Sequence, residues 1–303
     1  MNIIFLVILV LIVLLVSVVV LLASNNNKSN IKGININLKT YKDLLLEYND
    51  SVKKTIGGIP KIIIKTSWQQ ATNLPVEIIE VLRITSTLNP DYSVYYFDDN
   101  DVERFMKDYG LREYNAYKKI IPGAFKADLF RYCLLYKYGG CYSDIGHVML
   151  KSFDYIIGDS SLVIVKDNPF IMHFSGIHNA LLCSTKNNEF MKLVINKTIE
   201  NIENNYYGNG PLDITGPEMM GKIYQCYYKD YCNKELNELN FISQDGVEIL
   251  YLVATTNGFV IKNKDKEILL KTKFDNYNDV QYGRQTNKVH YGRLWHNRKV
   301  YRE

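Results

Sequence analysis

The sequence predicts an α/β fold, because segments with the spacing of strands and of helices alternate along most of its 303 residues. Residues 62–109 have the pattern strand, helix, strand, helix, and residues 124–145 have that of a helix that ends at a glycine pair and leads into another strand. A separate apolar run occupies the amino terminus. We therefore expect one α/β domain preceded by a membrane-spanning helix.

The composition is that of a globular protein, with 47% hydrophobic and 22% charged residues. The net charge of +4 is spread along the chain, and the absence of a basic block argues against nucleic acid as a partner. Without its amino-terminal part the chain keeps roughly 250 residues, enough for one large domain.

The five cysteines show no CxxC pair, so zinc-ligand spacing is absent. Cys226 and Cys232 are close enough in sequence for a local disulfide in an oxidising compartment. Five free thiols are the alternative, and the sequence leaves both open.

Residues 1–23 are expected to be a transmembrane anchor. Ile3 to Ala23 is apolar except for Ser17, and a helix of this length, at about 1.5 Å per residue, spans a hydrocarbon core of about 30 Å. A cleaved signal peptide is the competing interpretation, but the run is long and no basic residue precedes it. Lysines follow the segment, which by the positive-inside rule would keep the domain cytoplasmic. The orientation stays open.

Residues 24–55 are expected to form a linker and stem, with a short helix at Tyr41–Lys54, and residues 56–303 the domain. The breakers and periodicities predict the following elements in chain order. They are a strand at Ile62–Ile64, a helix at Pro75–Leu88, a strand at Ser93–Phe97, a helix from the Asp98-Asp99-Asn100 cap to about Tyr109, a helix at Ala124–Tyr138, a strand at Cys141–Ile145, a strand at Ser161–Val165, a helix at Glu189–Asn204 and a hairpin of Phe259–Ile261 with Ile268–Leu270.

The helix at Ala124–Tyr138 carries the chemistry. An apolar stripe on it is expected to pack on the sheet, while Asp128 and Arg131, three residues apart, lie side by side on another face. Gly139-Gly140 ends the helix with the positive φ that such a position favours. In the strand that follows, alternation places Tyr142 and Asp144 on the same side.

Three stretches resemble glycosyltransferase family 32, which is related to the catalytic domain of the large clostridial glucosylating toxins. They are IPKIIIKTSW at 59–68, NPDY with YYFDD at 89–99, and ADLFRY with GGCYSD at 127–144. Asn179-Ala180 and Thr215-Gly216-Pro217 are similar to later signatures of the family, so the resemblance covers about residues 56–220. The central stretch, with its spaced acidic, basic and glycine positions, is the specific one.

The resemblance implies a GT-A fold, a Rossmann-like nucleotide-diphospho-sugar transferase domain. It implies a UDP- or GDP-sugar donor, a divalent cation (Mn²⁺ or Mg²⁺) and transfer of a hexose with retention to a glycan, glycolipid or glycoprotein acceptor. Such enzymes are often membrane-anchored and luminal. We leave an ER- or Golgi-like lumen and a viral or cytoplasmic-facing membrane open as compartments.

By this resemblance Asp128 accepts hydrogen bonds from donor-sugar hydroxyls, with Arg131 beside it, and Asp144 holds the metal. Trp68 is expected to stack on the base and Tyr142 to take part in donor binding. The plain alternatives are a core tryptophan, an intrahelical Asp–Arg pair on a solvated face, and a strand-end aspartate that caps a turn.

Gly146 departs from the family pattern, which has a second aspartate there. Asp144 could hold the metal with water and the diphosphate, or another residue could replace the ligand, or the protein could catalyse nothing. His290 is the expected replacement, with His296 as its alternative, because the segment VHYGRLWH at 289–296 resembles the family's closing segment. Arg284 and Arg293 are further candidates for diphosphate charge. His147 could serve only if the strand turns before it.

Three functions therefore compete. The leading hypothesis is an active, anchored hexosyltransferase. The second is a degenerate relative that binds a nucleotide sugar, a glycan or a protein, and the third is a membrane scaffold without a ligand.

Overall fold

The computed structural model describes residues 38–51, 54–168, 176–229, 245–283 and 289–303. The expected anchor at residues 1–23, Cys232 and Arg284 lie outside these ranges. Within them, no helix is both long and apolar enough to cross a bilayer. Residues 38–303 form one compact unit.

Nine strands of the described residues form one mixed sheet. They are β3 (Ile62–Thr66), β4 (Ser93–Phe97), β5 (Gly140–Ser143), β6 (Val148–Met149), β7 (Leu162–Lys166), β8 (Leu181–Ser184), β9 (Val247–Thr255), β10 (Gly258–Lys262) and β11 (Ile268–Lys271). Their order across the sheet is β4-β3-β5-β8-β7-β9-β10-β11-β6. Strands β4, β3 and β5 run parallel, as do β7 and β9, and the other pairs are antiparallel. The parallel part places the carboxyl ends of β3 and β5 side by side.

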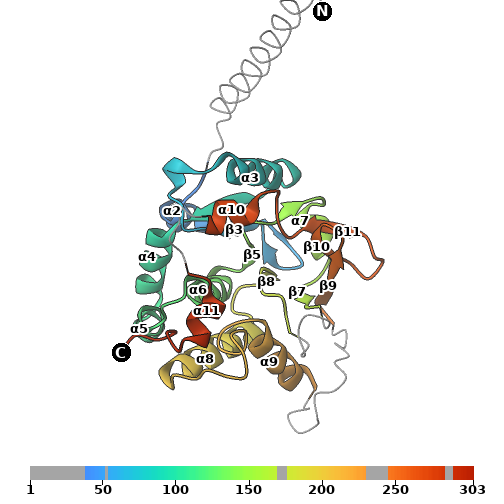
Figure 1. The fold of residues 1–303 in the computed structure, drawn as a ribbon. Coiled ribbons are helices and arrows are strands. Elements are labelled where there is room, and N and C mark those ends of the chain that lie inside the picture. The colour runs from blue at the N-terminus through green and yellow to red at the C-terminus, as the bar shows by residue number, and fades with distance from the viewer. Residues whose placement is uncertain (1–37, 52–53, 169–175, 230–244, 284–288) are drawn as a thin grey trace, which may run out of the picture. The chain divides into compact units, whose positions relative to one another are not determined.

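Helices cover both faces of this sheet. They are α2 (Tyr41–Ser51), α3 (Val76–Leu88), α4 (Asp99–Tyr109), α5 (Leu111–Lys119), α6 (Gly123–Tyr138), α7 (Phe153–Ile157), α8 (Glu189–Glu203), α9 (Pro217–Lys229), α10 (Tyr277–Tyr282) and α11 (Tyr291–His296). A short hairpin of β1 (Thr55–Ile56) and β2 (Ile59–Pro60) precedes β3. Figure 1 shows α3 along one side of the sheet and α6, α8 and α9 along the other.

The predicted alternation of strands and helices over residues 62–109 is confirmed, and so is the late hairpin, now β10 and β11. The side chain of Asp98 accepts hydrogen bonds from the backbone N–H groups of Asn100 and Asp101, as an N-cap should. Helix α2 was expected in a stem outside the domain. Its Tyr41 and Leu44 are fully buried in the core, so the folded unit begins before residue 56.

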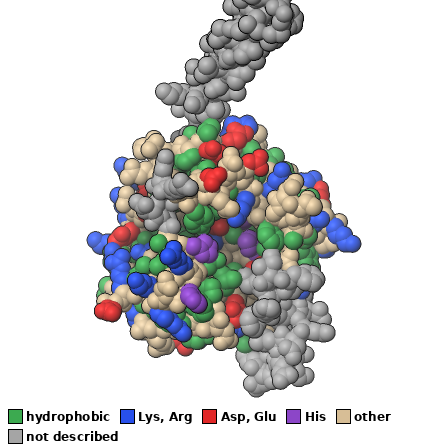
Figure 2. Space-filling view, in the orientation of Figure 1, with side chains coloured by type: hydrophobic (Ala, Val, Ile, Leu, Met, Phe, Trp, Pro, Cys, Tyr) green, Lys and Arg blue, Asp and Glu red, His purple; other side chains and the backbone are tan. Residues whose placement is uncertain are grey.

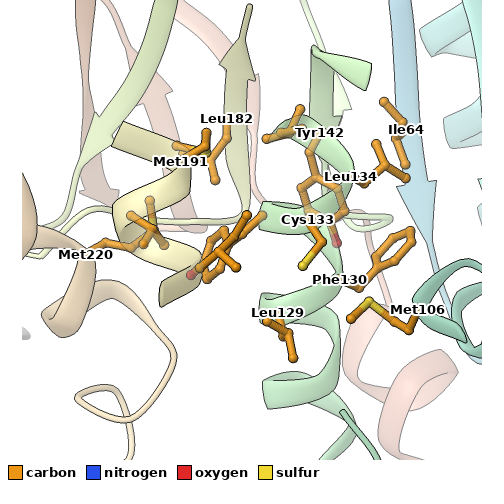
Figure 3. Packing of buried hydrophobic residues seen from close by; sticks show 14 of the residues in the cluster. Ile64, Met106, Leu129, Phe130, Cys133, Leu134, Tyr142, Leu182, Met191 and Met220 are labelled. Carbon is orange, nitrogen blue, oxygen red and sulfur yellow. The ribbon is translucent and has the colours of Figure 1, made fainter. Parts of the chain in front are cut away.

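Helix α6 is the centre of the core rather than an amphipathic cover. Ten of its sixteen residues are buried, because β5 and β8 pack on one side of the helix and α4 and α8 on others. Figure 3 shows Phe130 of α6 beside Met106 of α4, and Leu134 beside Ile64 of β3. A buried helix of this kind holds its polar side chains in fixed positions, which matters for Asp128 and Arg131.

The glycine pair after α6 is required by its backbone and by close packing. Gly139 and Gly140 have φ of +69° and +97°, and a β-carbon at Gly140 would lie 2.3 Å from Cγ1 of Ile62. Strand β5 then ends at Ser143, not at Ile145 as the sequence suggested. The chain turns there, and the N–H of His147 donates to the carbonyl of Asp144 at 3.0 Å.

Candidate functional site

Asp128, Arg131, Tyr142 and Asp144 meet at the carboxyl end of β5. Asp128 and Arg131 come from α6. Tyr142 comes from the last residues of β5, and Asp144 comes from the turn that follows the strand. The sequence predicted these four side chains as site residues, and the structure brings them together.

Asp128 is a buried carboxylate with its own hydrogen-bond donors. Thr215 Oγ1 donates to its Oδ2 at 2.7 Å, and Asn179 Nδ2 donates to its Oδ1 at 2.9 Å. Burial raises the pKa of Asp128 to about 6, against the opposing influence of Arg131 and these two hydrogen bonds. A carboxylate accepts about four hydrogen bonds, so acceptor capacity remains for a ligand.

Arg131 links the two carboxylates. Its guanidinium lies 3.4 Å from Asp128 Oδ1 and 3.2 Å from Asp144 Oδ1, and its Nη1 donates to the carbonyl of Asn179 at 2.7 Å. The same group stacks over the ring of Tyr142 at 4.3 Å. The solvated intrahelical pair considered from the sequence is therefore excluded, because the Arg131 side chain is only 6% exposed.

Asp144 is braced from below by Lys65. Nζ of Lys65 donates to the carbonyl oxygen of Asp144 at 3.1 Å and to Ser143 Oγ at 3.2 Å. Lys65 is fully buried, and this burial lowers its pKa to about 7. The Asp144 carboxylate itself is 36% exposed and accepts a hydrogen bond from the Tyr142 hydroxyl at 2.9 Å. Sequence reasoning assigned Lys65 no role at this site.

Two cavities flank this cluster. The first, of about 210 Å³, is lined by Trp68, Thr66 and Tyr142 among others, and the second, of about 400 Å³, by Asp128, Asp167 and His178 among others. Both are lined by Arg131 and Asp144 and by the tyrosines 277, 282 and 291. A larger hollow of about 790 Å³ lies between α8 and α9, away from this cluster.

Trp68 lies on the wall of the first cavity, and its Nε1 donates to Gln281 Oε1 at 3.2 Å. His290 is exposed and caps α11, where its Nδ1 accepts a hydrogen bond from the N–H of Gly292 at 3.2 Å. Its ring lies against Tyr291, with centroids 4.3 Å apart. It lines neither cavity, so its role as a metal ligand stays a prediction.

The metal expected at Asp144 finds little support in the donor set. A β-carbon at Gly146 would lie 2.7 Å from Cε2 of Tyr277 and 2.9 Å from the carbonyl oxygen of Thr272. No side chain can therefore project from position 146 without displacing its neighbours. In the described part of the chain, no three His, Cys, Asp or Glu side chains are placed to hold a metal ion. Because Arg131 already pairs with the Asp144 carboxylate and no ligand side chain can stand at position 146, the residues present do not fit a divalent cation.

The turn after Ser143 does re-orient His147, as a role in metal binding would require, but it buries the ring. His147 is 1% exposed, and its Nδ1 lies 3.1 Å from Ser143 Oγ. It stacks on His178, with centroids 6.1 Å apart. Burial lowers the pKa of both histidines, so both are neutral near pH 7. Figure 2 shows histidine side chains near the hollowed centre of this face, with Lys and Arg gathered at the side of α4 and α5.

Some residues of the site were missed by sequence reasoning. Asn179 and Thr215 were noticed only as parts of later signatures, and the structure shows that both hydrogen-bond Asp128. Tyr277, Tyr282 and Tyr291 reach the site from α10 and α11. No local signal singled out these three among the 24 tyrosines of the chain.

Comparison with known proteins gives one family match. Residues 75–163 match the model of a family described as "Glycosyltransferase sugar-binding region containing DXD motif". This range contains Asp128, Arg131, Tyr142 and Asp144.

Two curated relatives are similar over part of their length. One is the inositol phosphoceramide mannosyltransferase 3 of Schizosaccharomyces pombe, 29% identical over 57% of this chain and 49% of the relative. The other is the initiation-specific alpha-1,6-mannosyltransferase of Candida albicans, 26% identical over 46% of this chain and 40% of the relative. The chain thus spans about half the length of the curated relatives that it matches.

Among solved structures, the PaToxG glycosyltransferase aligns with a TM-score of 0.46 and 17% identity, over 62% of this chain and 78% of that one. A likeness at this level is too weak to carry an argument about the site.

Proposed function

The chain belongs to the family-32 type of glycosyltransferases with a DXD-type sugar-binding region, and from this premise we propose that it is a hexosyltransferase. It takes a UDP- or GDP-linked hexose as donor and a glycan, glycolipid or glycoprotein as acceptor. The domain has a GT-A fold, and transfer retains the anomeric configuration. The observation that supports this proposal best is the ion-paired Asp128–Arg131–Asp144 cluster beside two cavities.

Each residue of the cluster has a task in this proposal. Asp128 accepts hydrogen bonds from hydroxyls of the donor sugar, because Thr215 and Asn179 hold its carboxylate in one orientation. Arg131 stabilises negative charge on the leaving diphosphate, and its stack on Tyr142 fixes the guanidinium plane. Trp68 provides a flat wall for the base in the first cavity.

Asp144 lines both cavities, and hydrogen bonds from Lys65 and Tyr142 hold it in position. We assign it to the donor, as an acceptor for ribose or sugar hydroxyls. The Mn²⁺ or Mg²⁺ expected from the sequence, with Asp144 and His290 as ligands, stays a prediction, and no step of this proposal passes through it.

The proposal also includes the sequence's expectations for organisation and place. Residues 1–23 anchor the protein as a single-pass membrane protein, a linker follows, and the catalytic domain, together with α2, extends to residue 303. The membrane side is a lumen of ER or Golgi type or the cytoplasmic or viral face. A topology test with a protease, applied to membranes that contain the full chain, decides which side carries the domain.

One observation favours a second candidate function. Gly146 replaces the second carboxylate of the family pattern, which suits a degenerate relative that binds a nucleotide sugar or a glycan without turnover. Donor turnover separates the two functions. Full-length protein is incubated with a panel of UDP- and GDP-sugars, and release of the nucleoside diphosphate is measured. Because both relatives are named mannosyltransferases, GDP-mannose heads this panel.

Release from at least one donor, lowered by about 10–100-fold in Asp128→Asn, supports the hexosyltransferase. If a nucleotide sugar stabilises the folded protein against heat but none is turned over, the binding function replaces it.

A further inference from the structure

A site for a nucleotide sugar must stabilise the negative charge of the diphosphate. Resting on the function proposed above, we propose that the donor diphosphate is bound by Arg131 and by the hydroxyls of Tyr277, Tyr282 and Tyr291, in place of a divalent cation. The ligand class is a nucleoside diphosphate, free or linked to a sugar.

Position 146, where the family pattern has its second aspartate, has no room for a side chain. The ring of Tyr277 and the carbonyl of Thr272 lie where a β-carbon at residue 146 would point, 2.7 Å and 2.9 Å away. Gly146 does not have the positive φ that would favour glycine for its backbone. The glycine therefore makes room for Tyr277, because the ring of Tyr277 occupies the space that a carboxylate side chain at position 146 would need.

The Asp144 carboxylate is already paired with a positively charged side chain, Arg131. Asp144 lies 3.2 Å from Nη1 of Arg131, and the ammonium of Lys65 lies beneath its backbone carbonyl. A divalent ion at Asp144 would sit close to the guanidinium, and like charges at such distances repel. A single carboxylate paired in this way is a poor metal ligand, because the ion would have to compete with Arg131.

Three tyrosines that line the cavities each carry a hydroxyl that can donate a hydrogen bond. Each of the three residues lines both cavities, and none of their hydroxyls is hydrogen-bonded to another described residue. Partial burial raises the pKa of all three, with Asp144 adding to the effect at Tyr277 and Tyr282 and Asp128 at Tyr291. The phenols therefore stay protonated at physiological pH and can donate hydrogen bonds to phosphate oxygens.

The test measures binding directly. The full chain is titrated calorimetrically with UDP, GDP, uridine and guanosine, once in buffer with excess EDTA and once with Mn²⁺. We expect one diphosphate to bind with Kd values that agree within about threefold in the two buffers. The matching nucleoside should bind more weakly, because the phosphate contacts are lost.

Single variants Tyr277→Phe, Tyr282→Phe and Tyr291→Phe remove one hydroxyl and keep the ring. Each should weaken binding of the diphosphate by about tenfold, the usual effect of losing a hydrogen bond to a charged group. The affinity for the nucleoside should stay unchanged. Tyr251→Phe on β9 is the matched control, because Tyr251 is exposed and lines neither cavity. It should change nothing.

Three outcomes overturn the inference. Binding that requires Mn²⁺ would refute it and leave the hexosyltransferase in place. Tyrosine variants that bind the diphosphate as tightly as the control would refute the role of the hydroxyls. If neither diphosphate binds in either buffer, the donor site itself fails, and the proposed function falls with the inference.

Discussion

The ammonium of Lys65 donates a hydrogen bond to the backbone carbonyl of Asp144, at a distance of 3.1 Å, from a position with no solvent exposure. This contact ties the end of β3 to the turn that presents the Asp144 carboxylate. Since burial lowers the pKa of Lys65 to about 7, the brace is charged only up to about neutral pH.

Lys65 makes the stability of the fold depend on pH. Between pH 7 and 10 the unfolded chain holds a proton on this lysine that the folded chain has released. The free energy of unfolding should therefore rise with pH in this window, by up to about 1.4 kcal/mol per pH unit. Urea titrations of the wild type and of Lys65→Met at pH 7, 8 and 9 measure it, and the variant should lose this part of the slope. Equal slopes in the two proteins would show that Lys65 keeps an ordinary pKa.

Gly146 should not tolerate a side chain. Gly146→Ala is expected to lower the free energy of unfolding by about 1–3 kcal/mol, because the added methyl group overlaps Tyr277 and a backbone carbonyl. Gly123→Ala is the matched control, since a β-carbon there meets nothing within 4 Å. Thermal or denaturant unfolding compares the two. A Gly146→Ala protein as stable as the control would contradict the packing described here.

The sequence predicted the site better than it predicted the surroundings of the site. Asp128, Arg131, Tyr142 and Asp144 were identified because their spacing is local, along one helix and the strand after it. The brace at Lys65 and the filling of the space at Gly146 depend on contacts over about 80 and 130 residues of chain. No periodicity encodes such contacts. Strand β9, between β7 and β10, also escaped the prediction, although its run of Val, Ile, Leu and Tyr is a local strand signal.

Local pattern also failed at helix α6, which is buried on most of its surface. The sequence placed Asp128 and Arg131 on a face of α6 separate from its apolar stripe, with a solvated face as the alternative, whereas both residues are themselves buried at 7% and 5% exposure. Their burial depends on Asn179 and Thr215, which lie far along the chain.

Asp128 should control the acidic limb of activity. With a pKa of about 6, its carboxylate is ionised above this pH and protonated below it. We expect kcat/KM for the donor to fall as the pH drops through about 6. Asp128→Asn should lower kcat/KM by about 10–100-fold, the cost of losing a charged hydrogen-bond acceptor, and should remove this limb. A variant that keeps the acidic limb would assign it to another group.

Trp68 should set affinity for the base. Trp68→Ala is expected to weaken the binding of a nucleoside and of its diphosphate by about tenfold each, since stacking on an aromatic ring contributes about 1–3 kcal/mol. Trp68→Phe should restore most of the loss. Calorimetric titration with both ligands measures the effect. Loss of the diphosphate alone would place Trp68 at the phosphates rather than at the base.

Release of a nucleoside diphosphate from sugar donors by the full-length protein tests the central claim most directly. The account predicts turnover of at least one UDP- or GDP-hexose by the wild type, no measurable turnover by Asp128→Asn with Arg131→Lys combined, and unchanged turnover by Tyr251→Phe. A folded wild-type protein that releases nothing from any donor, with or without Mn²⁺, would contradict it.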